Sequence, residues 1–115
     1  MRIEVKGRNV VVADELRERI EKRCEKVARQ ISPLAVMEVE LSEERNPSIK
    51  DGQIVECTLR LKGVTLRSRS AATSMTHAVN EAAEDLARQV KRHRDKRRDR
   101  RSARNAEEVR PATSP

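Results

Sequence analysis

The chain has 115 residues, which is enough for one domain with a single hydrophobic core. Charged residues make up 39% of it, Phe, Tyr and Trp are absent, and the net charge of +7 indicates a polyanionic partner, either nucleic acid or an acidic membrane surface. No apolar run approaches the roughly 20 residues of a membrane span, and the lack of aromatic residues argues against folds such as RRM and OB domains, which stack bases on a sheet.

The first two predicted elements are a strand and a helix. Residues 2–6 alternate between charged and apolar side chains, which predicts a half-buried strand. Gly-Arg-Asn at 7–9 interrupts it. A helix is expected to begin near Asp14, where negative charge is favoured, and to end at Ser32-Pro33. Its helically spaced apolar residues are Leu16, Ile20, Cys24, Val27 and Ile31.

Three further strands are predicted after this helix. Residues 35–42 and 55–62 alternate, and the polar stretch 43–52 between them contains two turn signals. Lys62-Gly63 is a tight turn into a strand over 64–70, so the last two strands should form a hairpin. The side chains expected to face the core are Met37, Val39, Leu41, Val55, Cys57, Leu59 and Leu61.

A second helix is expected to begin near Thr73 or Ser74, because either side chain can cap it. Beyond Val90 the core-facing positions would be His93 and Arg97, so the helix becomes polar on every side, which is typical of solvent-bridging, partner-bound or frayed helices. The apolar stripe before that point consists of Met75, Val79, Ala82, Ala83, Leu86 and Val90.

The element order β-α-β-β-β-α predicts an α+β fold with a four-stranded mixed sheet. The first two strands flank a helix, which implies a right-handed parallel crossover, and the remaining strands form an antiparallel meander with both helices on one face. We expect this domain to span residues 1–101. The composition of residues 102–115 predicts a disordered tail or the start of a linker.

Most of the positive charge lies in one C-terminal segment. Residues 88–104 contain ten basic and two acidic residues and carry +8, so the rest of the chain sums to −1. On the first helix, a rotation of about 100° per residue places Arg19 with Lys22, Arg23, Lys26 and Arg29 on a basic flank, and Glu18, Glu21 and Glu25 on an acidic flank. On the second helix, Arg88, Lys91 and Arg92 lie on the outer side, followed by Arg94 and Lys96 past the core.

These two basic sets could form one positive surface with a projecting arm, which would bind phosphates without reading sequence. The alternative is a disordered basic tail that binds any polyanion weakly. The predicted RNA-binding residues are Lys22, Arg23, Lys26, Arg29, Arg88, Lys91, Arg92, Arg94 and Lys96.

The sequence gives little indication of catalysis. Cys24 and Cys57 fall on core-facing positions and are expected to be reduced core thiols, and no CxxC is present. His77 and His93 lie on different sides of the second helix and far from either cysteine, so no zinc site is expected. With no P-loop, GxGxxG or GxSxG motif, we expect no enzyme, no cofactor and no small-molecule substrate. The N-terminus lacks a signal peptide's apolar region, which favours the cytosol.

Several of these features together resemble the ribosome hibernation factors, the ribosome-associated inhibitor A and hibernation-promoting factor proteins of the sigma-54 modulation family. The opening MRIEVKGRNVVVADELRERIEKR is similar to that family's short strand, Gly-Arg-Asn, and helix beginning Ala/Asp-x-Leu-Arg-Glu. Further along, Ser-Met-x-x-Ala-Val at 74–79 is followed by Asp-Leu-x-Arg-Gln at 85–89 and a basic helix end. The resemblance covers about residues 1–100.

The resemblance implies a domain similar in shape to double-stranded RNA-binding domains. It would dock on the 16S rRNA of the small ribosomal subunit, in the channel used by mRNA and by A- and P-site tRNA. The same docking would take place in whole 70S ribosomes. Bound there, it would block initiation and keep idle ribosomes inactive but intact in stationary phase or stress, by steric occlusion. The family's basic positions match Lys22, Arg23 and Lys26 in the first helix and Arg88, Lys91, Arg92 and Arg94 in the second.

The chain departs from the family pattern at two positions. Thr76 stands where the family often has Tyr, and Ala13 replaces a usual Thr cap. Long members carry a further dimerisation domain after a linker, and the resemblance leaves open whether this chain is a short member or a long one cut inside its linker. The alternative function is a generic double-stranded RNA-binding module without ribosome specificity.

Overall fold

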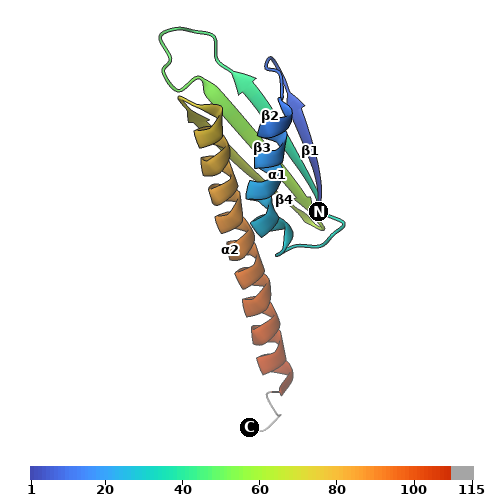
Figure 1. Cartoon of the computed structure of the whole chain (residues 1–115). Helices are drawn as coiled ribbons and strands as arrows, with labels where there is room; N and C mark the ends of the chain where they lie inside the picture. Colours follow the sequence, from blue (N-terminus) through green and yellow to red (C-terminus); the bar gives the residue numbers. More distant parts are fainter. Residues whose placement is uncertain (110–115) are drawn as a thin grey trace.

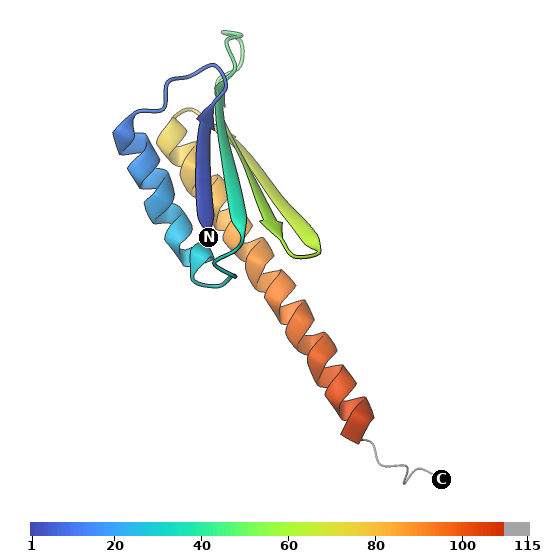
Figure 2. The ribbon, with the colours of Figure 1, turned by 90° about the vertical axis from the view of Figure 1, so that its right-hand side faces the viewer.

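The structure is a computed structural model that describes the backbone of residues 1–109 and the side chains of residues 1–100. Its four strands form one sheet in the order β1-β2-β3-β4, and both helices cover the same face of that sheet (Figures 1 and 2). The predicted α+β fold and its β-α-β-β-β-α order are confirmed. The elements are β1 (Arg2–Gly7), α1 (Asp14–Ala28), β2 (Val36–Glu43), β3 (Gln53–Leu61), β4 (Val64–Ala72) and α2 (Met75–Val109).

The strand pairing is mixed, as predicted. β1 pairs with β2 in parallel, while β2 with β3 and β3 with β4 are antiparallel. The register aligns Val5, Val39, Cys57 and Ser68 in one row across all four strands. Because side chains alternate between the two faces of a strand, this row points to the helix-covered face and its neighbours point to the other face.

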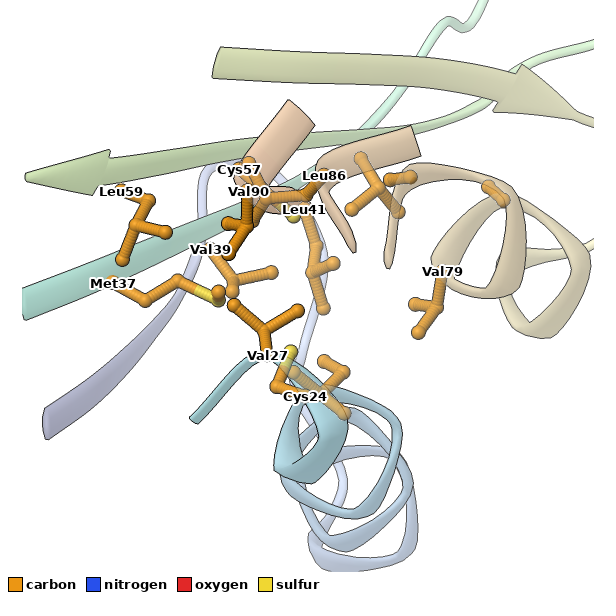
Figure 3. Close-up of a cluster of buried hydrophobic side chains, with 14 of the residues drawn as sticks. Cys24, Val27, Met37, Val39, Leu41, Cys57, Leu59, Val79, Leu86 and Val90 are labelled. Carbon is orange, nitrogen blue, oxygen red and sulfur yellow. The ribbon is translucent and has the colours of Figure 1, made fainter. Parts of the chain in front are cut away.

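The core lies between the sheet and the two helices and is built from aliphatic and sulfur-containing side chains (Figure 3). The stripe predicted for the first helix is buried at Ile20, Cys24 and Val27, and the alternating residues of β2 and β3 are buried opposite them. The remaining fully buried large side chains are Met37, Val39, Leu41, Val55, Leu59, Leu86 and Val90.

Hydrogen bonds attach α2 to β4, which is an edge strand of the sheet. The buried Ser68 hydroxyl donates to the carbonyl of Ala82 at 2.9 Å. Gln89 Nε2 donates to the carbonyl of Arg67 at 2.6 Å and to Asp85 Oδ2 at 2.8 Å. These bonds fix the rotation of α2 about its axis, and with it the direction of its outward side chains.

Helix α1 ends earlier than the sequence predicts. Its last helical residue is Ala28, four residues before Ser32-Pro33, so the predicted boundary is wrong. The backbone N–H of Gln30 bonds to the carbonyl of Val27 at 3.0 Å, and its side-chain Nε2 donates to the carbonyl of Lys26 at 3.1 Å. The side chain therefore takes the acceptor that the next α-helical bond would use, and the last turn tightens.

Both helix starts agree with the sequence. Ala13 precedes α1 without any side-chain cap, and Ser74 caps α2 by accepting a hydrogen bond from the backbone N–H of His77 at 3.2 Å. Helix α2 then runs as 35 residues to Val109 and projects far beyond the sheet (Figure 2).

The end of α2 differs from the predicted disordered tail over residues 102–115. Residues 102–109 continue the helix, because they contain no Gly or Pro and are rich in the helix formers Ala, Arg and Glu. The rest of the predicted tail, residues 110–115, lies outside the described residues.

Candidate nucleic-acid interface

Helices α1 and α2 lie side by side on the sheet (Figure 1). Their side chains leave a groove of about 790 Å³ between the two helices. The buried stripe of α1 points into the core, so its long charged side chains extend over the groove, while α2 contributes mostly short side chains. The lining residues are Glu15, Glu18, Arg19, Lys22, Arg23, Glu25, Lys26 and Arg29 at α1, and Asn80, Ala83, Glu84 and Ala87 from α2.

The four RNA-binding residues predicted at the first helix, Lys22, Arg23, Lys26 and Arg29, all line this groove. All four are exposed, and within residues 1–100 none of them forms an ion pair. Cationic side chains that are not held by a carboxylate can contact the phosphates of a nucleic acid directly. The structure therefore brings these four residues together, and their RNA contacts remain a prediction.

The groove also contains carboxylates, which corrects the expected separation of charges on the first helix. Glu18 and Glu25, which were expected on a separate acidic flank, line the groove together with Glu15 and Glu84. The space beside α2 is wide enough to span parts of both flanks. Five basic and four acidic residues line the groove together, so the groove is close to neutral rather than strongly positive.

Small side chains on α2 keep the groove open. Ala83 and Ala87 leave space that larger residues would fill, and Asn80 lies between them and the start of the helix. The Asn80 side-chain oxygen is buried and has no hydrogen-bond partner within the described part of the chain. Sequence reasoning placed Ala83 in the core stripe and missed Asn80 and Ala87. Their spacing of three and four residues marks one helix face, but only the packing of α1 shows that this face borders a groove.

The basic residues predicted on the second helix lie elsewhere, because none of them lines the groove. All five are exposed, and Arg88 forms an ion pair with Asp85 at 3.6 Å. Lys91 and Arg94 follow Ala87 at helical spacings of four and three residues, so they extend the groove-side face of α2 into the projecting part. The basic set at α1 therefore lines the groove, while the basic set of α2 lies further along α2, outside the groove. The five residues are Arg88, Lys91, Arg92, Arg94 and Lys96.

A cluster at the start of α2 connects it to β4. The Ser70 hydroxyl donates a hydrogen bond to the Glu81 carboxylate, and His77 Nε2 lies 2.9 Å from Glu81 Oε1. The Ser70 hydrogen bond, aided by His77, holds the pKa of Glu81 below its ordinary value. These contacts join β4 to the first turns of α2.

The two thiols belong to the core. Burial raises the pKa of Cys24 to about 12 and that of Cys57 to about 11. Both side chains therefore remain protonated near neutral pH and serve as small apolar groups, as predicted. Within the described residues, no three His, Cys, Asp or Glu side chains come together in a way that could hold a metal ion. None of the described helices has the length and apolarity needed to cross a membrane.

Comparison with known proteins gives one family match and several structural neighbours. The family described as sigma 54 modulation protein / S30EA ribosomal protein matches residues 3–98, which is most of the chain. No curated protein matches the sequence significantly.

Two solved structures are similar to this chain over nearly their whole length. The N-terminal domain of Protein Y from Thermus thermophilus has a TM-score of 0.70 and 26% identity, covering 81% of this chain and 99% of that one. A ribosomal subunit interface protein from Coxiella burnetii has a TM-score of 0.67 and 21% identity, covering 83% of this chain and 99% of that one. The second likeness shows the fold alone, because its identity is low.

Proposed function

The chain belongs to the sigma 54 modulation protein / S30EA ribosomal protein family, and from this premise we propose that it binds the small ribosomal subunit and keeps idle ribosomes inactive. In this proposal residues 1–101 form the ribosome-binding unit. It occupies the channel of mRNA and of A- and P-site tRNA on 16S rRNA, in free subunits and in whole 70S ribosomes. Translation is blocked by steric occlusion in stationary phase or stress, which requires no catalytic step and takes place in the cytosol.

The observation that carries this proposal is a row of cations at one side of the molecule that form no ion pair within residues 1–100. Lys22 and Lys26 extend over the groove, and Lys91 extends the same side along the projecting helix. A folded RNA offers phosphates at fixed positions, so a rigid row of Lys and Arg can match it by shape and charge. The absence of aromatic side chains fits this kind of recognition, since no base stacking is needed.

The description of the family supports a ribosomal partner. The family that matches residues 3–98 is described as S30EA ribosomal protein. A generic double-stranded RNA-binding module is the competing function. It would bind naked duplexes about as tightly as ribosomes, whereas the proposed factor requires the arrangement of RNA found on the small subunit.

Co-sedimentation on a sucrose gradient tests the proposal. Purified 30S subunits and 70S ribosomes are mixed with the protein, alone or with an excess of duplex RNA or of tRNA bound at the P site. We expect the protein to co-migrate with ribosomes in the presence of excess duplex RNA, and P-site tRNA to displace it. If every added RNA displaces the protein from ribosomes, the protein is a nonspecific basic binder instead.

A further inference from the structure

A second pocket, of about 630 Å³, lies just beyond the C-terminal end of α1, where α2 leaves the core. The turn after α1, the β3–β4 turn and one stretch of α2 form its walls. This pocket is separate from the groove between the helices, and no residue lines both. It does not take part in the proposed contacts of the groove with RNA.

The floor of this pocket is aliphatic. Ile31, Leu61 and Val90 line it, and Leu34 beside them is 89% exposed, the second most exposed large apolar side chain of the described core domain after Val11. Two polar side chains in the wall are already used to close the turn. Gln30 donates to the carbonyl of Lys26, and the Ser32 hydroxyl accepts from the backbone N–H of Leu34 at 3.1 Å.

The rim of the pocket is cationic. Lys62, Arg94 and Arg97 line it together with His93, and no carboxylate does so among the described residues. Arg60 also lines it, but its guanidinium pairs with Glu38 at 3.2 Å. The groove between the helices, by contrast, contains four glutamates. His93 and Arg97 occupy the stripe positions after Val90 that would be apolar if the core continued.

We propose that this pocket binds an acidic protein segment that carries aliphatic side chains. The floor offers apolar contact for one or two Leu, Ile or Met side chains, and the rim offers counter-charges for flanking Asp or Glu. The volume is in the usual range for a specific binding pocket.

Two other occupants fit the pocket less well. A nucleic acid would use the cationic rim through its phosphates, but it has no aliphatic groups to cover the exposed Leu34 and the aliphatic floor. A second copy of this chain would bring another +7 charge to a cationic rim. Arg94 of the rim also belongs to the predicted RNA-binding set, so the inference is tested at Leu34 and Lys62, which are outside that set.

Fluorescence anisotropy with a labelled peptide of leucines spaced among glutamates tests the inference on the full chain. Two control peptides replace all leucines by serine or all glutamates by glutamine. We expect both controls to bind about tenfold or more weakly, because each loses one of the two kinds of contact. Equal binding of the serine peptide would reduce the effect to general charge attraction and overturn the inference.

Matched variants locate the binding site. The double variant Leu34→Ser/Lys62→Glu should lose the peptide and still co-sediment with ribosomes. The control Ile49→Ser/Lys50→Glu makes the same changes at an exposed apolar residue and a lysine in the loop between β2 and β3, and should bind the peptide normally. Backbone amide NMR shifts should centre on residues 31–36 and 90–97. Shifts centred on the α1–α2 groove would overturn the inference.

Discussion

The side-chain amide of Asn9 makes both hydrogen bonds of a strand pair with the backbone of Glu43: its Nδ2 donates to the Glu43 carbonyl and its Oδ1 accepts from the Glu43 N–H, each at 2.8 Å. The backbone pairing of β1 with β2 ends just before, where the N–H of Arg8 donates to the carbonyl of Leu41 at 2.8 Å. A Cβ at Gly7 would collide with the carbonyl oxygen of Val10, so the chain can turn here only with glycine. The Gly-Arg-Asn segment thus closes one end of the sheet.

Replacing Asn9 by Ala should destabilise the fold by about 1–2 kcal/mol, since two exposed hydrogen bonds are lost. Urea unfolding followed by circular dichroism measures the change. Arg8→Ala is the matched control, because its side chain is exposed and forms no hydrogen bond or ion pair within the described residues. A similar loss in both variants would show that the Asn9 bonds contribute nothing specific.

Reversing four charges on the proposed RNA surface should abolish ribosome binding without unfolding the protein. The variant carries Glu at Lys22, Lys26, Lys91 and Arg92, all of which are exposed and form no ion pair among the side chains of residues 1–100. Co-sedimentation and circular dichroism report binding and folding separately.

A control with an equal change in net charge carries Glu at four exposed basic residues away from this surface: Arg8, Arg17, Lys50 and Arg67. This control should keep most of its binding. Equal loss in both variants would mean that net charge alone, and not its placement, drives association.

Binding to ribosomes should weaken by orders of magnitude between about 50 and 200 mM salt, because several phosphate contacts release counterions. Each contact removed should lower the slope of log affinity against log salt by about one, so Lys91→Ala should flatten the slope by that amount. A slope unchanged in Lys91→Ala would exclude this lysine from the contact.

Removing a carboxylate from the groove should strengthen RNA binding. Glu25→Gln and Glu84→Gln keep the side-chain shape and remove a charge that repels phosphate, so we expect a gain of a few-fold each at low salt. Glu21→Gln, on α1 but outside the groove, is the control for total charge. An equal gain in all three would argue that RNA does not enter the groove.

The two buried thiols should make stability fall at high pH. Their pKa values are raised from 9.0 to about 12 for Cys24 and about 11 for Cys57, so the unfolded chain loses these protons first. The stabilisation is complete below pH 9 and is lost as pH rises through these values. Free energies of unfolding from urea titrations should therefore drop more steeply above pH 9 for the wild type than for Cys24→Ala/Cys57→Ala. Parallel curves would contradict this.

Periodicity alone predicts the fold correctly, because its signals are local and repeated. The alternation of Met37, Val39 and Leu41, and the helical spacing of Ile20 and Cys24, each correspond to one buried face. The end of α1 could not be predicted in this way. The helix ends where the Gln30 side chain bonds to the carbonyl of Lys26, whereas the helix-ending signal in the sequence, Ser32-Pro33, begins four residues after Ala28.

The candidate site could be predicted only on one side. The basic residues of α1 follow from helix geometry, but the opposite wall depends on how α2 packs against α1. Asn80 and Ala87 carry no charge and form no motif, so nothing in the sequence separates them from other helix residues. The inclusion of Glu18 and Glu25 has the same origin, since a helical wheel does not show where the neighbouring helix begins.

Because α2 is a single helix without interruption, the packing of Leu86 and Val90 against the sheet sets the direction in which the cations at positions 91–100 point. The projecting part of α2, residues 91–109, is about 28 Å long, and its rotation about the helix axis is fixed by the packing of the residues before it. One residue inserted after Val90 would turn the whole arm by about 100° while every core contact stays in place. Seven inserted residues would make about two full turns, which nearly restores the original rotation of the projecting helix and lengthens it. The arm should thus tolerate single substitutions far better than single insertions, and lengthen only in steps of whole turns.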